Sequence, residues 1–376
     1  MSKKYSVFIT ASFCLFIFGF GAALILSPSR DFSEQENRYL AQFKAPTLDT
    51  LRSGKFMEDF EDYVVDQFPL RDGWIQLKAL SERALGKKEN NKVYFGTDGQ
   101  TLFAHFNAAS RDDLAQRVGY VDKLAGNVDV PVYLALIPDK SYVWSGLLPA
   151  GAPNVDDGST IAQVKELCGD GVRSIDLSDA LSGDDVFYRT DHHWTTMGAY
   201  QGYLALARAM GVLEGSGDAP SYELRSDAFY GTTWSSAGAG WVPPDSIYAS
   251  IPEGGTKGRV TVTGYPKGLP VESTMYHEEK LSAKDKYAYF LGGNQPLCVI
   301  KDPDAAGGKL LVIRDSYSDC LAPFLAESFQ EVHLFDPRYS NMSLKGYVSD
   351  NDIDQVLVLY SVSNFTTDRN LFKLGQ

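Results

Sequence analysis

The alternation of strand and helix patterns in the C-terminal part of the chain is the feature that most constrains the fold. Residues 318–329 (SDCLAPFLAESF) have helical character and lie between two strongly apolar runs. Apolar strands that alternate with helices are typical of a parallel sheet with helices on both faces. The sequence therefore predicts an α/β domain. Its strands of parallel character are expected at LCVIKD (297–302), KLLVIRDS (309–316), EVHLFDPR (331–338) and DQVLVLYSVSN (354–364).

The same alternation extends toward the N-terminus. VPVYLALIPDK (130–140) has the pattern of a buried strand that runs into a polar loop, and VRSIDLSD (172–179) is a weaker strand. Residues 195–210 predict a helix that Thr195 or Thr196 can cap and that Gly211 can end.

Before the first of these strands, the pattern changes to helices and a hairpin. Residues 51–85 show a helical apolar face that Pro69 interrupts. NKVYFGTDGQTLF (91–103) alternates and predicts a hairpin that turns at Asp98-Gly99.

The N-terminus predicts a membrane anchor. After Lys3 and Lys4, residues 5–29 (YSVFITASFCLFIFGFGAALILSPS) carry no charge. A run of more than about 20 apolar residues is long enough to cross a bilayer as a helix, and the preceding lysines favour a cytoplasmic start. We expect an uncleaved single-pass anchor with the main domain outside the cell; a cleaved signal peptide is the alternative.

These patterns predict three regions. Residues 1–29 form the anchor, residues 30–50 are a polar tether, and residues 51–376 form the extracellular domain. Within that domain, residues 212–285 are rich in Gly, Pro, Ser and Tyr, and we expect loops and short antiparallel strands there.

Charge and cysteine content exclude several classes of function. The 376 residues carry a net charge of −13, which argues against a nucleic-acid partner because phosphate binding needs clustered Lys and Arg. Of the four cysteines, Cys14 lies in the apolar span, and the others have no zinc or CxxC spacing. Cys298 and Cys320 lie in apolar runs and are expected to be buried thiols.

Polar side chains follow the predicted strands. In such sheets, ligands bind beyond the carboxyl ends of the strands, so these residues predict a cleft rim, although every strand must end in something polar. We expect substrate or oxyanion contacts from Lys140 and Asp315, and from the Arg338 guanidinium, which could equally form a structural ion pair. The full set is Asp139, Lys140, Asp315, Ser316, Asp336, Arg338, Ser363 and Asn364.

Ser316 is the candidate nucleophile. It follows a buried strand directly and begins the helix at 318–329, so its hydroxyl would lie at a tight strand-to-helix turn where helix amides can stabilise an oxyanion. The alternative is that Asp315 or Ser316 only caps this helix.

The stretch YRTDHHWTTMGAY (188–200) supplies the candidate base. In an extended segment, Asp191 and His193 share a face, as a serine nucleophile and its imidazole base require. A metal site and a purely structural cluster are the alternatives, although tetrahedral zinc needs at least three converging protein ligands. Position 194 is a tryptophan and not a cysteine, so a thioester mechanism of the DHHC type is excluded.

Two further residues are weaker candidates. Asn294 in LGGNQP could donate its amide to an oxyanion, or the segment could be a plain glycine turn. Trp194 could stack on a sugar ring, although large aromatic residues more often belong to the core.

The motif TDHHWT with the downstream LLVIRDSYSDCLAPFL resembles the DHHW family of bacterial envelope proteins. The resemblance extends to ENRYLAQF (36–43), DFEDYVVDQFPLRDGW (59–74), YFLGGNQPL (289–297) and NFTTDRN (364–370). This family is related to the SGNH-hydrolase-like proteins of the AlgX and AlgJ type, which take part in O-acetylation of exported polysaccharides. The resemblance implies an SGNH-like fold.

The resemblance also implies a catalytic triad. A D-x-H-W motif and a later serine at a strand end correspond here to Asp191, His193 and Ser316, an order unlike that of ordinary SGNH esterases. His192 has no role in this pattern. The implied partners are an acyl donor, a polysaccharide acceptor and a membrane acyl-carrier protein; no cofactor is expected.

We therefore expect a serine O-acetyltransferase or acetylesterase of the cell envelope. The alternative is a non-catalytic protein that binds polysaccharide or organises an export complex, because a tether and many aromatic residues would serve it equally well.

Overall fold

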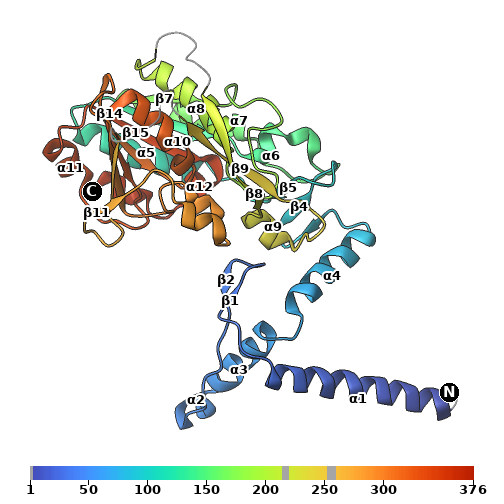
Figure 1. Ribbon diagram of the computed structural model, residues 1–376. Coiled ribbons are helices and arrows are strands. Elements are labelled where there is room, and N and C mark those ends of the chain that lie inside the picture. The colour runs from blue at the N-terminus through green and yellow to red at the C-terminus, as the bar shows by residue number, and fades with distance from the viewer. Residues whose placement is uncertain (1–2, 214–219, 252–259) are drawn as a thin grey trace. The chain divides into compact units, whose positions relative to one another are not determined.

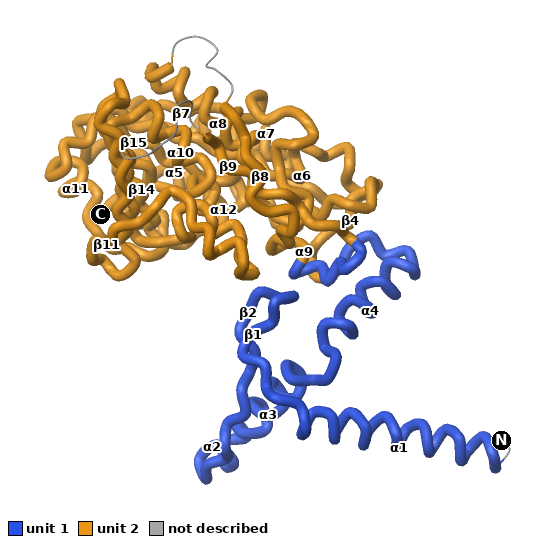
Figure 2. Tube along the Cα trace, viewed as in Figure 1, with its two compact units in different colours: residues 1–90, 235–241 blue, residues 91–234, 242–376 orange. Residues whose placement is uncertain are grey.

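A computed structural model describes residues 3–213, 220–251 and 260–376. These residues form two compact units (Figure 2). The first unit comprises Met1–Asn90 and Ser235–Trp241, and the second comprises Asn91–Trp234 and Val242–Gln376. The predicted boundary between tether and domain at residue 50 stays a prediction.

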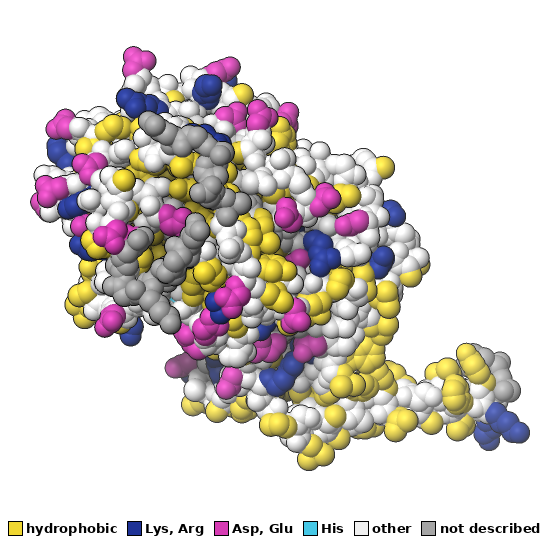
Figure 3. Space-filling model, turned by 45° about the horizontal axis from the view of Figure 1, so that its top comes forward, with side chains coloured by type: hydrophobic (Ala, Val, Ile, Leu, Met, Phe, Trp, Pro, Cys, Tyr) yellow, Lys and Arg dark blue, Asp and Glu magenta, His cyan; other side chains and the backbone are white. Residues whose placement is uncertain are grey.

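The first unit begins with helix α1 (Lys3–Leu26), which fits the predicted anchor. It is the one helix among the described residues that is long and apolar enough to cross a membrane, and its mean hydropathy reaches 2.3. None of its most apolar window is buried inside the protein. The space-filling view shows apolar side chains along this helix and basic ones near its N-terminus (Figure 3).

The rest of the first unit is a short hairpin with three helices. The predicted helical region 51–85 is confirmed, and Pro69 lies between two of its helices. Asp66 ties the hairpin to its neighbouring helix, because it accepts hydrogen bonds from the Arg38 guanidinium and from the backbone N–H of Ala41. The elements are β1 (Phe32–Ser33), β2 (Arg38–Tyr39), α2 (Leu48–Ser53), α3 (Lys55–Asp66), α4 (Arg71–Ala84) and β3 (Glu89–Asn90).

The second unit is built on one eight-stranded sheet in the order β11-β10-β12-β14-β13-β15-β6-β7. The five strands from β14 to β7 are parallel. The predicted α/β class with a largely parallel, helix-flanked sheet is therefore confirmed. The strands are β6 (Val132–Ile137), β7 (Val172–Asp176), β10 (Thr261–Gly264), β11 (Val271–Ser273), β12 (Leu297–Lys301), β13 (Gly307–Arg314), β14 (Phe329–Phe335) and β15 (Gln355–Ser361).

One strand differs from the prediction. The run 297–302 was expected to have parallel character, but β12 pairs antiparallel with β14 and with β10. Both faces of β12 are nevertheless largely buried, and a strand buried on two faces is apolar throughout in either orientation. Apolar composition therefore could not distinguish the two directions.

Helices cover both faces of the sheet (Figure 1). Strand side chains alternate between two cores: Leu134 of β6 packs with α5 and α7, whereas Ala135 packs with α8 and α10. The helices of the first face are α5 (Arg111–Asn127), α7 (Asp157–Leu167), α11 (Leu344–Asp350) and α12 (Val362–Thr367). Those of the second are α8 (Thr196–Ala209) and α10 (Tyr317–Ser328), where the buried Cys320 packs.

Local signals of the sequence are confirmed at several points. Thr195 caps α8 through a hydrogen bond from the Gly198 N–H to its Oγ1, and Gly211 follows the helix with a φ of 74°. Cys298 and Cys320 are buried and unpaired. Strands β4 (Val93–Phe95) and β5 (Leu102–Ala104) form the predicted hairpin.

The predicted insertion at 212–285 does contain antiparallel strands. Strand β8 (Ser221–Phe229) pairs antiparallel with β9 (Asp245–Ile251), and β10 and β11 extend the main sheet. Residues 214–219 and 252–259 of this insertion lie outside the described residues.

Candidate active site

Ser316 lies where β13 meets α10 and keeps its hydroxyl free of the helix. Its side chain makes no capping hydrogen bond. Instead, Asp315 Oδ1 accepts from the backbone N–H of Tyr317 at 3.0 Å. Asp315 therefore makes the capping hydrogen bond that the sequence left open between these two residues. Ser316 is also partly exposed, whereas Asp315 is fully buried.

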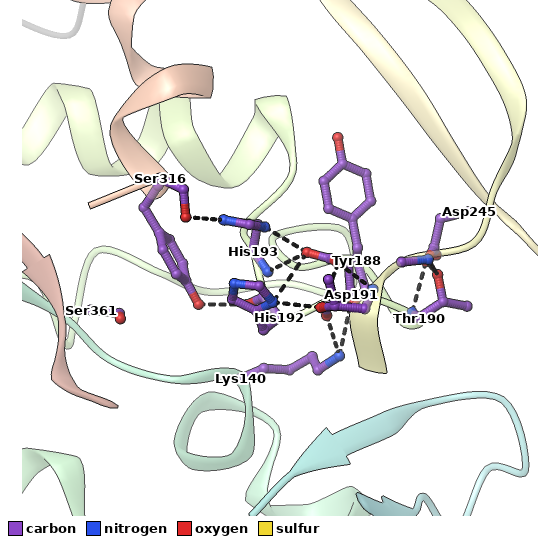
Figure 4. Close-up of polar contacts among 12 residues, drawn as sticks. Lys140, Tyr188, Thr190, Asp191, His192, His193, Asp245, Ser316 and Ser361 are labelled. Carbon is purple, nitrogen blue, oxygen red and sulfur yellow. Dashed lines mark hydrogen bonds and ion pairs between the residues drawn. The ribbon is translucent and has the colours of Figure 1, made fainter. Parts of the chain in front are cut away.

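Ser316, His193 and Asp191 form one hydrogen-bonded chain (Figure 4). The Oγ of Ser316 lies 2.7 Å from Nε2 of His193, across 123 residues of sequence. Nδ1 of the same imidazole lies 2.6 Å from Oδ1 of Asp191. Since an ionised carboxylate only accepts, Nδ1 carries the proton and Nε2 is left to accept from the serine. Their catalytic roles stay a prediction.

The loop that carries Asp191 and His193 is not extended as expected. It is a bent loop closed by an antiparallel bridge between Phe187 and Trp194. Asp191 Oδ1 accepts from both the backbone N–H and the ring of His193, so the two side chains meet through a local turn. The expected proximity is present, but its cause is a turn and not strand alternation.

Asp191 is held as an anion. It is 2 % exposed, and four hydrogen bonds reach its carboxylate, two from His193 and two from Thr232 at 2.7 and 2.9 Å. Burial alone would raise its pKa, but electrostatic interaction with His192 and His193 and the hydrogen bonds from His193 hold the pKa well below its ordinary value. This carboxylate can therefore orient an imidazole and stabilise its cation.

Two buried charged residues hold the loop from opposite sides (Figure 4). Lys140 Nζ donates to the carbonyls of Tyr188, Arg189 and Asp191, at 2.8, 3.1 and 2.6 Å. The Asp245 carboxylate accepts from the backbone N–H groups of Arg189 and Thr190. Together they fix the position of Asp191.

Lys140 has no ammonium donor left for the substrate contact that the sequence suggested. Its ammonium has three donors, and all three are used by backbone carbonyls. Burial lowers the pKa of this side chain to about 8.

Trp194 and Asp315 also belong to the framework. Trp194 has no exposed surface and donates its indole N–H to the carbonyl of Tyr317 at 2.9 Å, so it cannot stack on a sugar. Asp315 Oδ2 accepts from Ser361 and from the amide of Asn364, which joins the ends of β13 and β15. The indole N–H of Trp194 and both carboxylate oxygens of Asp315 are thus engaged in hydrogen bonds within the protein.

Asn294 and Arg338 lie together on an accessible rim. Asn294 Oδ1 accepts from Arg338 Nη2 at 3.3 Å and from Arg314 Nη1 at 3.4 Å. Arg338 also forms a two-point ion pair with Asp336. The structural ion pair considered from the sequence is therefore present. The side-chain NH₂ of Asn294 is turned away from the two guanidinium groups, because the side-chain oxygen accepts their hydrogen bonds.

Several residues of the site were missed in the sequence. Tyr287 stacks on His193, with ring centroids 3.9 Å apart and planes 9° apart. Thr232, at the start of α9 (Thr232–Ala237), and Asp245 support the loop as described above. Thr232 and Asp245 lie in the predicted insertion and Tyr287 lies two residues beyond it, and only their position after folding distinguishes them from the many other Tyr, Thr and Asp residues of the chain.

Asp191, His192 and His193 also meet the spacing of a cation site. One ligand atom from each lies within 4.8 Å of the others. In this structure the same groups are engaged in hydrogen bonds, because Asp191 accepts from His193 and Thr232, and His192 Nδ1 lies 2.8 Å from Thr232 Oγ1. A metal bound by Asp191 and His193 would have to replace hydrogen bonds of these two residues.

Two family models match parts of the chain. Residues 172–335 match a family model described as DHHW protein. The resemblance to the DHHW family is confirmed. This DHHW match contains Asp191, His193 and Ser316. A second model, described as SGNH hydrolase-like domain, acetyltransferase AlgX, matches residues 103–231.

Solved structures share the fold of this chain. A DHHW family protein from Eubacterium siraeum is 22% identical, with a TM-score of 0.65 over 76% of this chain and 95% of that one. Bacillus cereus PatB1 with a sulfonyl adduct is 21% identical, with a TM-score of 0.63 over 76% and 99%. Another PatB1 structure is 22% identical, with a TM-score of 0.61 over 75% and 99%. No curated protein matches the chain.

Proposed function

We propose that this protein is a serine acyltransferase that moves an acetyl group to a hydroxyl of an exported or cell-envelope polysaccharide. The observation that carries the proposal is the hydrogen-bonded chain from Ser316 through His193 to the ionised Asp191. A serine becomes nucleophilic when a neutral imidazole of fixed tautomer accepts its proton.

The first half of the reaction forms an acyl-enzyme. Ser316 Oγ attacks the carbonyl carbon of an acyl ester while its proton moves to Nε2 of His193. The bond from this carbon to the donor's leaving oxygen breaks, and His193 gives the proton to that oxygen. Asp191 stabilises the imidazolium while it exists.

The second half transfers the acyl group. The oxygen of an acceptor hydroxyl attacks the ester carbon, and its proton moves to His193. The bond to Ser316 Oγ breaks, and the serine recovers the proton. The proposed oxyanion donors are the backbone N–H of Ser316 and the Asn294 amide, whose oxygen is held by Arg314 and Arg338.

Family descriptions support transfer of acetyl in particular. The model that matches residues 103–231 is described as an acetyltransferase. With water as acceptor, the same steps would give an esterase. The fraction of acetyl passed to an added alcohol distinguishes the two.

We further propose that α1 anchors the protein with its second unit outside the cell. The uncharged stretch of this helix from residue 5 to residue 26, and Lys3 and Lys4 at its start, support this orientation. A separate membrane carrier would then deliver the acyl group, since an acyl donor made in the cytoplasm must cross the bilayer.

The test uses the full-length protein in detergent with 4-nitrophenyl acetate and a sulfonyl fluoride. PatB1 has been obtained with a sulfonyl adduct, which supports this choice of probe. We expect a burst of nitrophenol and a single label on Ser316. Ser316→Ala should abolish both, and His193→Ala should lower their rates about 10³-fold or more.

Ser318→Ala is the matched control. This serine lies in the same helix, is buried, and its hydroxyl has no hydrogen-bond partner among the residues described. Its loss should leave the burst intact. Labelling that persists in Ser316→Ala, or a stoichiometric metal whose removal abolishes the burst, would refute the proposal. Polysaccharide binding without any burst would favour the scaffold function.

A further inference from the structure

His192 is the one residue of the DHHW motif that the proposed mechanism does not use. Its ring lies next to that of His193, with centroids 3.9 Å apart and planes 36° apart (Figure 4). Its side chain is 36% exposed, whereas that of His193 is 7% exposed. Of the two imidazoles, His192 is therefore the one that a ligand can reach more freely.

Hydrogen bonds determine the tautomer of His192. Thr232 Oγ1 donates its only hydrogen to the ionised Asp191, at 2.9 Å. The same oxygen lies 2.8 Å from Nδ1 of His192, so it must accept there, and Nδ1 must carry the proton. Nε2 of His192 is then an acceptor, and no described residue donates a hydrogen bond to it.

Both imidazoles thus carry their proton on Nδ1 and a lone pair on Nε2. Each turns its Nδ1–H toward Asp191, directly in His193 and through Thr232 in His192. Each therefore presents an Nε2 lone pair on the ring edge away from that carboxylate. Partial burial and the charge of His193 lower the pKa of His192, so its lone pair persists when His193 takes up a proton.

We propose that Nε2 of His192 binds the hydroxyl next to the one that is acylated, so that the acceptor is a vicinal diol of a sugar. The inference rests on the proposed function. His193 must receive the proton of the attacking hydroxyl, and a second acceptor on the ring beside it suits a second hydroxyl on the neighbouring carbon. The ring centroids of His192 and His193 lie 3.9 Å apart, which is of the same order as the separation of hydroxyl oxygens on adjacent ring carbons.

This arrangement gives a physical reason for transfer to sugar in preference to water. A diol held at two points brings its attacking oxygen to the ester at a high effective concentration, which water cannot match. An acceptor with no second hydroxyl on the adjacent carbon would lack the hydrogen bond to Nε2 of His192. His192 is thus a specificity-determining residue of the acceptor site.

The test compares two acceptors that each carry two hydroxyls. Full-length protein is acetylated by 4-nitrophenyl acetate, and kcat/KM for transfer is measured with cyclohexane-1,2-diol, in cis and trans forms, and with cyclohexane-1,4-diol. We expect the better 1,2-diol to exceed the 1,4-diol about fivefold or more, the worth of one neutral hydrogen bond.

A matched pair of variants assigns this preference to Nε2. His192→Asn keeps a donor near Nδ1 but lacks an acceptor at Nε2, so the ratio should fall to about one. His192→Gln places an amide oxygen near Nε2 and should restore part of the ratio. His277→Asn, which changes a histidine outside the candidate site, should keep the wild-type ratio.

The outcomes separate this inference from the proposed function. A burst and acetyl transfer with equal use of both diols would overturn the vicinal-diol inference alone, as would an unchanged ratio in His192→Asn. If wild-type protein gave no burst, the proposed function would fail and the inference with it. Because the readout is a ratio within each variant, partial loss of folded protein does not affect it.

Discussion

The ring of Tyr287 lies flat against the imidazole of His193, with centroids 3.9 Å apart and planes 9° apart. Tyr287 belongs to the 3₁₀-helix η3 (Lys286–Tyr289), is buried, and has a hydroxyl without a hydrogen-bond partner among the described residues. The contact is therefore made by the ring face. With Asp191 and Ser316 at the two edges of the imidazole, this face fixes the remaining degree of freedom, rotation of the ring.

Two substitutions of Tyr287 should distinguish the effect of its ring from the effect of its hydroxyl. Tyr287→Phe keeps the stack and removes an unpaired buried hydroxyl, so acylation and thermal stability should be close to wild type. Tyr287→Leu removes the flat face, and a misplaced imidazole should slow the burst about 10- to 100-fold. Stopped-flow nitrophenol release measures both. Equal rates in the two variants would show that the stack does not position His193.

Asp191→Asn should abolish most activity although the side chain keeps nearly the same size and shape. An amide at this position can donate to Nδ1 of His193, which favours the tautomer with the proton on Nε2 and removes the acceptor for Ser316. We expect acylation to fall about 10⁴-fold. Burst kinetics provide the measurement, and circular dichroism checks the fold. A variant that acylates at a wild-type rate would exclude Asp191 from the mechanism.

Gly231→Ala should lower the acylation rate although Gly231 is not a residue of the triad. A Cβ at this position would lie 2.2 Å from Cβ and 2.4 Å from Oδ2 of Asp191, so the carboxylate must move. We expect the acylation rate to fall at least about 10-fold because His193 loses its alignment.

Gly119→Ala is the control for this glycine. Position 119 lies inside helix α5, and an added Cβ meets nothing within 4 Å. It should leave the rate unchanged and stabilise the protein by about 0.5–1 kcal/mol. Retention of full activity in Gly231→Ala would mean that the Asp191 side chain tolerates displacement.

Asp157 should make stability depend on pH. It is fully buried, its Oδ2 accepts from the Asp139 N–H at 2.6 Å, and burial raises its pKa. Below about pH 4 the carboxyl is protonated in both states. Above that, the unfolded chain loses the proton first, so the free energy of unfolding falls as pH rises toward the folded-state pKa.

The isosteric variant Asp157→Asn should flatten this slope, because an amide does not titrate and can still accept from the Asp139 N–H. Guanidinium unfolding followed by tryptophan fluorescence, at steps between about pH 4 and about pH 7, measures it. Asp129→Asn, at an exposed position, is the control and should keep the wild-type slope. An identical pH dependence in Asp157→Asn and wild type would contradict the assignment.

Much of the fold could be predicted from sequence because it depends on local composition. The apolar runs that became β6, β13, β14 and β15 are continuous because each is buried on two faces. Thr195 and Gly211 mark the ends of α8 by backbone chemistry that acts within a few residues. The direction of β12 could not be predicted, because pairing direction depends on a partner strand and not on the strand's own residues.

The sequence by itself determined which chemical groups were present: a serine after a buried strand, an Asp-x-His pair, and an apolar span at the N-terminus. The tertiary structure alone decided how they are used. It brought Ser316 to His193 across 123 residues, turned all three Lys140 donors onto backbone carbonyls, and buried Trp194. The reason is physical: hydrogen bonds and ring stacking act over a few ångströms, and only folding sets which distant residues come that close.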